Sequence, residues 1–578
     1  MTARARAAGP VARVFDWCRR PEVIAAVVAV VPIAVAIVRA LASGWIPVQD
    51  NAIIEMRSRD VASFDNFPLL GTWSSASLTA GVDLNHPGPL LFDLLAPFVW
   101  AFGGGPGIAI GIGLLNAASV IGCTVVAFRV GGQSASLAAS VVAGLLAWTL
   151  GSSLLIDPWN PHPVMLACLL MLMLTWGVAS GHLAMAPWLL AVASLCLQVH
   201  LGYAYLVPGC VLAAATGATV VFARRWRADP GVRRADLSRC RRIGAVSMLV
   251  VAVLWAQPLV EQLFGAGQGN LARIVSSAGG DEPVIGSVLA VRLVAAVTAM
   301  PPWWGRSSFT EAVEYAPMRD DGTVVATGLA GAAVSFLAVA VVLVALGVLA
   351  ALAWRRRDRV AAVLAAVASV LLCLAVAALA VSPFGPLGLT PHQMRWLWSV
   401  GAFVTFALLV GCLRPAAALL SDRNAAAVAW SMVSIVALVA VLDLPGSVQA
   451  AGPTTFVDQF ASARALRGQM LEYHPAGAVV VATDDLRFGE IYSTVVMSAL
   501  DEAGVEVRVA DEGWVRQLGE ARRVVGDEVV ELRIAEGEEA LTQRPDAVRV
   551  ALVKPDGDAD VRTVAVFATV LGAPVSGG

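Results

Sequence analysis

The sequence predicts a polytopic α-helical membrane protein with about eleven transmembrane helices, followed by a C-terminal extracytoplasmic α/β domain. Of its 578 residues, 58% are hydrophobic and only 14% are charged, and its mean hydropathy is +0.75. Soluble domains carry roughly 25% charged residues. Long apolar runs recur as far as residue 443, whereas the chain after residue 450 is charged and has none. These observations exclude a soluble enzyme, a disordered chain and a disulfide-stapled secreted module.

Eleven apolar segments approach the roughly 20 residues that a membrane-spanning helix needs. They are 23–43, 106–128, 135–154, 163–180, 184–199, 202–223, 243–258, 324–353, 360–382, 396–412 and 425–443. The first is expected to remain as an uncleaved span. Two further stretches, 89–102 and 285–302, are predicted to form helices along the outer interface. Counting either as a span would turn arginine-rich loops outward.

The arginines orient this predicted bundle, because short cytoplasmic loops collect basic residues. With the N-terminus inside, twenty arginines fall in inner segments and seven in outer loops, with large inner groups in 224–242 and 355–359. We therefore expect a multi-pass protein of a bacterial plasma membrane. Its predicted parts are a cytoplasmic N-terminus (1–22), a membrane domain (23–450) with outer loops at 44–105 and 259–323, and an extracytoplasmic domain (451–578).

The tail alternates segments typical of helices and strands, which predicts a small α/β domain. Helices are expected at 455–473 and 488–503, and strands at 477–483 and near 505–510, 528–534 and 547–554. Asp484 and Asp485 follow the first of these strands. A helix cap is the favoured interpretation of this pair, ahead of a functional site.

Unusual polar residues begin where the first predicted span ends. Asp50 follows that span directly, and Glu55 lies near the same face if the segment is helical. A carboxylate at a membrane rim can serve as a general base. On these residues alone, the favoured alternative is a helix cap by Asp50 with surface ion pairs to Arg57 and Arg59.

Further polar residues fall on the same predicted side of the membrane. Four of the six histidines lie there, although each one alone is more often structural than functional. A short loop, 157–162, which two prolines hold rigid, adds an acid and an indole, and an arginine follows the last of these histidines. This set consists of His86, Asp157, Trp159, His162, His200, His392 and Arg395. Their gathering on one side predicts a single polar site at the outer face.

The order of these features resembles a known family. An acidic residue follows the first span, His86-Pro87-Gly88-Pro89-Leu90 opens an interfacial helix, and Phe128-Arg129-Val130-Gly131-Gly132 ends the second span. This layout resembles the GT-C superfamily of integral-membrane glycosyltransferases, in the branch of protein O-mannosyltransferases and lipid A aminoarabinose transferases. The pattern covers residues 20–230, and the architecture covers the whole chain. Asn51 follows Asp50 here, whereas family members typically carry an Asp-Glu pair.

The resemblance implies transfer of a sugar from a polyprenyl-phosphate carrier to a hydroxyl of a cell-envelope glycan, lipid or protein. Asp50 would be the catalytic base, and Arg395, with Arg292 or Arg306, would stabilise the leaving phosphate. The residues expected to bind substrate are Glu55, His86, Asp157, Trp159, His162, His200, His392 and Arg395. Trp159 or Trp396 would stack on the sugar. A divalent cation on Asp50, Asp157 and a histidine is a less favoured alternative, because no metal-spacing motif is present.

Two other classes of function remain open from the sequence. One is a transporter or flippase of lipid-linked sugars, and the other is a non-catalytic envelope assembly protein. Transporters often contain internal repeats, and none is evident between the two halves of this chain. Eleven spans exceed what an anchor needs. The near-neutral net charge of −2 gives no attraction to nucleic acid.

Overall fold

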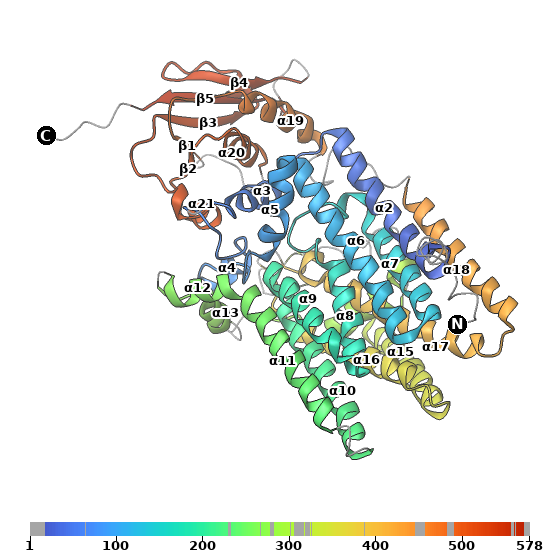
Figure 1. The fold of residues 1–578 in the computed structure, drawn as a ribbon. Coiled ribbons are helices and arrows are strands. Elements are labelled where there is room, and N and C mark those ends of the chain that lie inside the picture. The colour runs from blue at the N-terminus through green and yellow to red at the C-terminus, as the bar shows by residue number, and fades with distance from the viewer. Residues whose placement is uncertain are drawn as a thin grey trace, which may run out of the picture.

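The computed structural model describes residues 18–571 with several gaps. The gaps are 64, 229–232, 266, 278–282, 301, 306–316, 318, 320–323, 325, 327, 386–387, 445–456, 483–489, 556–559 and 561. Arg306 and the pair Asp484 and Asp485 therefore lie outside the described residues. Figure 1 shows a bundle of helices with a small sheet domain at one end.

Helices form almost all of the membrane domain, because apolar side chains cover most of their surface. Two short 3-10 helices matter for the site, η3 (Leu201–Tyr205) and η6 (Pro391–Met394). The α-helices are α2 (Pro21–Ser43), α3 (Asp50–Asp60), α4 (Ala76–Ala80), α5 (Leu90–Phe102), α6 (Gly104–Gly131), α7 (Gln133–Leu154), α8 (Met165–Ala179), α9 (Ala186–Val199), α10 (Val207–Ala228), α11 (Arg233–Leu254), α12 (Ala256–Phe264), α13 (Asn270–Ser277), α14 (Gly286–Thr298), α15 (Ala332–Arg355), α16 (Arg359–Val381), α17 (Trp396–Ala417) and α18 (Asp422–Asp443).

Each of the eleven predicted spans falls on a helix, but not all of these helices have full length. Among the described residues, eight helices are long and apolar enough to cross a membrane, or nine if α11 and α12 form one bent span. The other two predicted spans fall on α8 and α9, of 15 and 14 residues. Helices α5 and α14, with 13 residues each, are also too short to span. The polytopic fold is confirmed, with eight or nine full-length spans rather than eleven.

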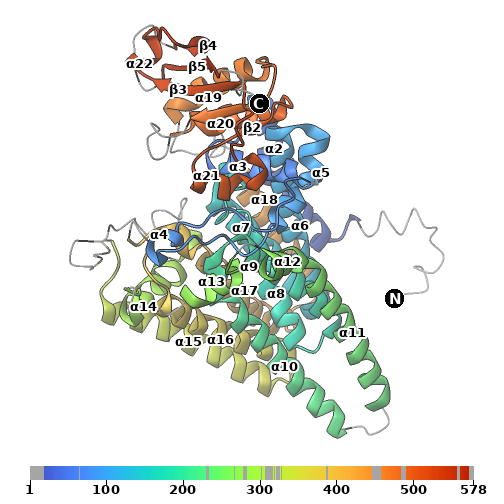
Figure 2. The same cartoon turned by 90° about the vertical axis from the view of Figure 1, so that its left-hand side faces the viewer.

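The basic turns and the sheet domain lie at opposite ends of the bundle (Figures 1 and 2). Arg225 and Arg227 end α10, and Arg355 ends α15, both far from the sheet. At the second of these turns, Arg414 donates to the Asp358 carboxylate at 2.7 Å. Which side of the membrane each end faces stays a prediction from the arginine distribution.

The tail folds into an α/β domain, as predicted. Its strands form one mixed sheet in the order β2-β1-β3-β5-β4, with β1 parallel to β2 and β3, and β5 antiparallel to β3 and β4. Strand β5 was not predicted, although it is apolar and lies inside the sheet. The elements are α19 (Val457–Leu471), β1 (Val479–Ala482), α20 (Tyr492–Glu502), β2 (Val507–Arg508), α21 (Glu512–Leu518), β3 (Val530–Glu536), α22 (Glu538–Leu541), β4 (Val548–Val553) and β5 (Val564–Val570).

Helix α3 joins the bundle to the tail domain through a fully buried carboxylate. Glu55 accepts hydrogen bonds from Arg59 at 2.8 Å, from the tail's Ser498 at 2.9 Å and from the tail's Arg467 at 3.4 Å. A Cβ atom at Gly104 would collide with this carboxylate. The glycine therefore lets α6 begin directly against Glu55.

A second ion-pair group lies along the same helix. Asp60 accepts from Arg57 and from the tail's Arg522, each at 2.8 Å, and Arg522 also donates to Asp501 at 2.7 Å. These groups are buried, so each charge needs its partner. The tail is therefore held to α3 by specific charge pairs, in addition to apolar contact.

We expect Glu55→Gln to weaken this joint. The substitution leaves two arginines beside a neutral amide, and breaking a buried pair costs about 3 kcal/mol here, since each arginine keeps a second carboxylate. Thermal unfolding and limited proteolysis of the tail should both begin earlier. The exposed Glu538→Gln is the matched control, and equal stability of the two variants would contradict the interpretation.

Candidate active site

Asp50 is the first residue of α3, directly after the turn that ends α2. It is exposed to solvent, and its Oδ2 accepts a hydrogen bond from the indole of Trp159 at 2.9 Å. Surrounding protein raises the pKa of this carboxyl, the Trp159 bond opposes the rise, and the charge of Asp157 adds to it. Asp50 is thus an accessible carboxylate with a raised proton affinity.

The loop between α7 and α8 is organised around Asp157. Its Oδ1 accepts from the Asn51 side chain at 2.7 Å, and its Oδ2 faces His162 Nδ1 at 2.6 Å. A carboxylate accepts, so Nδ1 of His162 carries the proton. Asp157 was predicted to contact substrate, but it is buried and its oxygens are occupied within the protein. It positions Asn51 and His162 instead.

Trp159 lies at the centre of the predicted residues. Its ring centroid is 5.0 Å from that of His162 and 5.4 Å from that of His392, and its N–H reaches Asp50. The indole of Trp396, the other stacking candidate, is buried in α17. Trp159 is therefore the aromatic side chain positioned beside Asp50.

The four histidines predicted to lie on the outer side form one chain of neighbours. His86 and His200 have ring centroids 5.2 Å apart, and the pKa of His200 is lowered first by burial and then by the proximity of His86, His392 and His162. Burial lowers the pKa of His86 to about 3 and that of His392 to about 4, and lowers that of His200 well below its usual value. Burial also lowers the pKa of His162, which its bond to Asp157 only partly opposes. These imidazoles are neutral near pH 7 and suited to hydrogen bonding.

Arg395 supplies a cation beside these neutral rings. It directly precedes α17, is 7% exposed, and its guanidinium carbon lies 5.9 Å from the ring centroid of Trp398. Burial lowers its pKa to about 9, so it stays protonated at neutral pH. Its charge lowers the pKa of His162 and of His392.

Two predicted contacts lie elsewhere. Glu55 belongs to the joint with the tail, where its oxygens are held by three side chains, and it does not face Asp50's partners. Arg292 donates to the carbonyls of Leu329 at 3.2 Å and Ala330 at 2.9 Å, which ties α14 to the start of α15. Both side chains are therefore engaged in contacts within the protein, away from Trp159.

The described residues do not form the ligand set that a divalent cation on Asp50, Asp157 and a histidine would need. Among the described residues, no three His, Cys, Asp or Glu side chains are grouped to hold an ion. Asp157 and His162 bond to each other rather than face a common point with Asp50.

Sequence reasoning missed three residues that shape the site. Asn51 links α3 to Asp157, and Tyr203 packs its ring against His200, with centroids 6.2 Å apart. Gln49, before Asp50, bonds to the tail domain. Asn51 was noticed only as a departure from the family pattern, and the other two carry no signal in the sequence.

Comparison with solved structures identifies the architecture. No family model matches the chain, and no curated protein matches it either. ArnT from Cupriavidus metallidurans, bound to undecaprenyl phosphate, matches with a TM-score of 0.52 over 93% of this chain and 97% of that chain. The sequence identity is 14%, and the apo form of the same protein gives 0.50. The chain has the fold of ArnT.

The likeness to ArnT confirms the predicted architecture of many membrane helices followed by a small α/β domain. The oligosaccharyltransferase of Archaeoglobus fulgidus covers 89% of this chain and 69% of its own, at 13% identity and a TM-score of 0.40. At 14% identity, the likeness to ArnT concerns the fold. The function has to be argued from the side chains around Asp50.

Proposed function

We propose that this chain is a membrane glycosyltransferase that takes a sugar from a polyprenyl-phosphate carrier. The acceptor is a hydroxyl of a cell-envelope glycan, lipid or protein at the outer face. One observation carries the proposal: the accessible carboxylate of Asp50 bonds to Trp159, whose ring neighbours His162 and His392, and the charge of the buried Arg395 acts on both of these histidines. The ArnT fold, determined with undecaprenyl phosphate, supports the class of donor.

Asp50 acts as the general base in this proposal. The acceptor oxygen forms a bond to the anomeric carbon and gives its proton to Asp50. The bond from that carbon to the phosphate oxygen breaks, and its electron pair leaves with the phosphate. A raised pKa improves a carboxylate as a base, because proton transfer is most efficient when the pKa approaches the working pH.

Arg395 stabilises the leaving phosphate. A guanidinium offers a planar pair of donors that fits phosphate oxygens. The nearby histidines are neutral, so they do not compete as cations. His86, His162, His200 and His392 instead donate to or accept from sugar hydroxyls, and Trp159 presents an aromatic edge to the sugar.

We expect Asp50→Asn to lower sugar transfer about 10²- to 10⁴-fold, the usual contribution of a general base. Folding and binding of the polyprenyl-phosphate donor should stay close to those of the parent. The measurement is transfer of labelled sugar in reconstituted membranes, with Asp65→Asn as control. Asp65 is an exposed carboxylate of the same outer loop.

Other results would contradict the role of Asp50 or assign the chain to another class of function. If Asp50→Asn leaves transfer unchanged, Asp50 is not the base. If the parent moves lipid-linked sugars across the membrane without transferring them, the chain is a transporter. If envelope assembly requires the chain but neither activity is present, it is a non-catalytic assembly protein.

Trp159→Phe should shift the pH dependence of transfer. The indole N–H stabilises the charged form of Asp50, so its removal raises the pKa of that carboxyl further. Less of the base is then ionised at a given acidic pH, and the acid limb of kcat/KM should move to higher pH. Trp100→Phe, which alters an exposed indole on α5, should leave the profile unchanged. A shift toward lower pH in Trp159→Phe would contradict the role of Asp50.

A further inference from the structure

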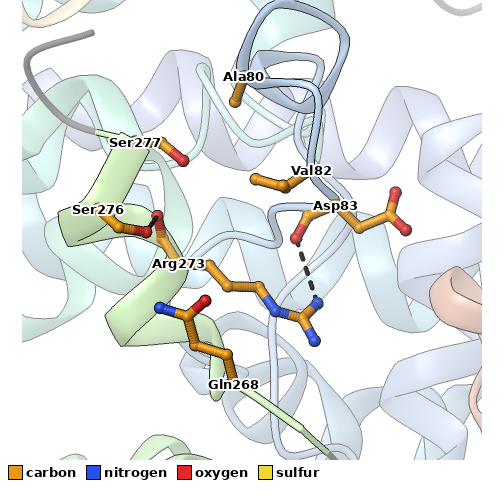
Figure 3. A pocket seen from close by; sticks show the side chains of 7 residues that line it. All are labelled: Ala80, Val82, Asp83, Gln268, Arg273, Ser276 and Ser277. Atoms are coloured by element: carbon orange, nitrogen blue, oxygen red, sulfur yellow. Dashed lines mark hydrogen bonds between the residues drawn. The ribbon is translucent and has the colours of Figure 1, made fainter.

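A cavity separate from Asp50 lies between the loop after α4 and helix α13. Its volume is about 540 Å³, within the range of roughly 300–1,000 Å³ typical of small-molecule sites. The residues that line it are Ala80, Val82, Asp83, Gln268, Arg273, Ser276 and Ser277 (Figure 3).

The lining of this cavity combines one cation with neutral polar groups. Figure 3 shows the guanidinium of Arg273 beside the cavity, near the amide of Gln268, and the hydroxyl of Ser277 pointing inward. The side chain of Asp83 points away, and its Oδ1 accepts from the indole of Trp73 at 3.2 Å. The backbone carbonyl of Asp83 faces Arg273 instead. No lining carboxylate therefore neutralises Arg273 from inside the cavity.

A second guanidinium approaches the same carbonyl from the tail domain. Arg516 of α21 donates to the Asp83 oxygen at 3.1 Å, and Arg273 donates to it at 3.5 Å. Burial lowers the pKa of Arg516, and the charge of Arg273 lowers it further, while Asp83 and Glu261 oppose both. The Glu261 oxygens already accept from the Asn270 N–H, at 2.9 and 3.2 Å. The positive charges of Arg273 and Arg516 thus lie close together and repel each other. A bound anion would reduce this repulsion.

The cavity is connected to the candidate active site through the backbone. Asn85 and Asn270 exchange hydrogen bonds of 2.9 and 3.0 Å, which fasten the start of α13 to the loop. His86 follows directly, and its ring faces His200. Two residues separate Asp83 from His86, so their Cα atoms, three peptide units apart, lie within about 11 Å.

We propose that this cavity binds an acidic saccharide, held by Arg273 while Arg516 adds its charge from the far side of the Asp83 carbonyl, and that the cavity recognises the acceptor in the proposed transfer reaction. Guanidinium groups select phosphate or carboxylate. Gln268 and Ser277 suit sugar hydroxyls, and Ala80 and Val82 offer an apolar wall to the ring. The acceptor role rests on the proposed function, whereas saccharide binding does not.

Binding can be measured without turnover, by calorimetry on the full-length chain in lipid nanodiscs. The probes are glucose 1-phosphate, glucuronate, glucose and inorganic phosphate. We expect at least one of the two acidic sugars to bind about 10-fold more tightly than glucose and inorganic phosphate, and the tighter of the two identifies the acidic group. Arg273→Gln and Arg516→Gln should each weaken this binding about 10-fold. The exposed Arg319→Gln is the matched control.

Several results would overturn the inference. Equal affinity for glucose and both acidic sugars would exclude recognition of the acid, and inorganic phosphate binding as tightly as glucose 1-phosphate would exclude recognition of the sugar. If Arg273→Gln and Arg516→Gln both bind the probes like the parent, the binding site does not lie in this cavity. Asp50→Asn should bind these probes like the parent. Failure of the proposed chemistry and failure of this site are therefore distinguishable.

An independent observation concerns the residue before Asp50. Gln49 has φ 49° and ψ −129°, a backbone conformation that favours glycine. The tail domain holds it there. The Gln49 N–H donates to Oγ1 of Thr494 at 2.9 Å, and its side-chain amide donates to the carbonyl of Glu490 at 3.3 Å. Thr494 is buried on α20 and in turn donates to the carbonyl of Ile491 at 3.0 Å.

We infer that Thr494 is a positioning residue for Asp50, acting through the backbone of Gln49. The strained backbone conformation of Gln49 sets the direction in which the Asp50 side chain points away from the backbone. On the other side of Asp50, the Asn51 side chain is fixed by Asp157. The inference rests on the proposed role of Asp50 and goes beyond it, because it assigns a catalytic contribution to the tail domain.

Thr494→Val removes the acceptor and keeps the shape of the side chain. We expect kcat to fall about 10- to 100-fold, the scale of a small misplacement, with the KM for the donor unchanged. Thr494→Ser keeps the hydroxyl and should behave like the parent. Gln49→Gly should restore most of kcat in the Thr494→Val background, because glycine adopts this conformation without strain.

Parental kcat in Thr494→Val would overturn this inference, whatever Asp50→Asn does. Loss of kcat that Gln49→Gly does not restore would assign Thr494 to tail stability instead. Thermal unfolding of each variant separates the two, because a positioning role leaves the unfolding temperature near that of the parent. An active Asp50→Asn would overturn the proposed base itself.

Discussion

The arrangement of this molecule depends on buried charge pairing along α3. This helix of eleven residues carries Glu55, Arg57 and Asp60 into the contact between the bundle and the tail. Such charges are stable only with partners, and Arg467 and Arg522 of the tail supply them. The tail therefore cannot shift freely along α3. Since Asp50 begins the same helix, the geometry of the candidate base is tied to a domain more than 400 residues away in sequence.

Much of the fold follows from the sequence, because lipid imposes simple rules on apolar length and charge. Every predicted span falls on a helix, and the basic turns lie opposite the sheet domain. The two short helices, α8 and α9, were taken as spans because apolar loop residues extend their hydrophobic runs beyond the helical segments. Strand β5 was missed because its continuous apolar run lacks the alternation that marks a half-buried strand. A strand in the middle of a sheet needs no such alternation.

The candidate site was predictable only in part. Polar residues in outer loops had to meet at one end of the bundle, and Trp159, His162 and His392 do so around Asp50. Glu55 was placed wrongly, since five residues along a helix turn the side chain by about 140° away from the first. The contacts from Thr494 and Arg516 could not be predicted, because no local pattern reports which tail residue will reach a loop formed 400 residues earlier.

The groups around Asp50 differ in protonation state at neutral pH. Burial lowers the pKa of the histidines, which leaves them uncharged, and it leaves Arg395 protonated because a guanidinium starts from a far higher pKa. The protein around the accessible Asp50 raises the pKa of its carboxyl, which makes it a stronger proton acceptor. At neutral pH the site therefore offers one cation and one accessible base among neutral donors and acceptors. This separation suits a reaction in which a phosphate leaves on one side of the sugar while a hydroxyl loses its proton on the other. The tail domain contacts both the bend before Asp50 and the Asp83 carbonyl beside the cavity. An acceptor held against the tail would consequently be positioned by the same rigid joint that positions the base.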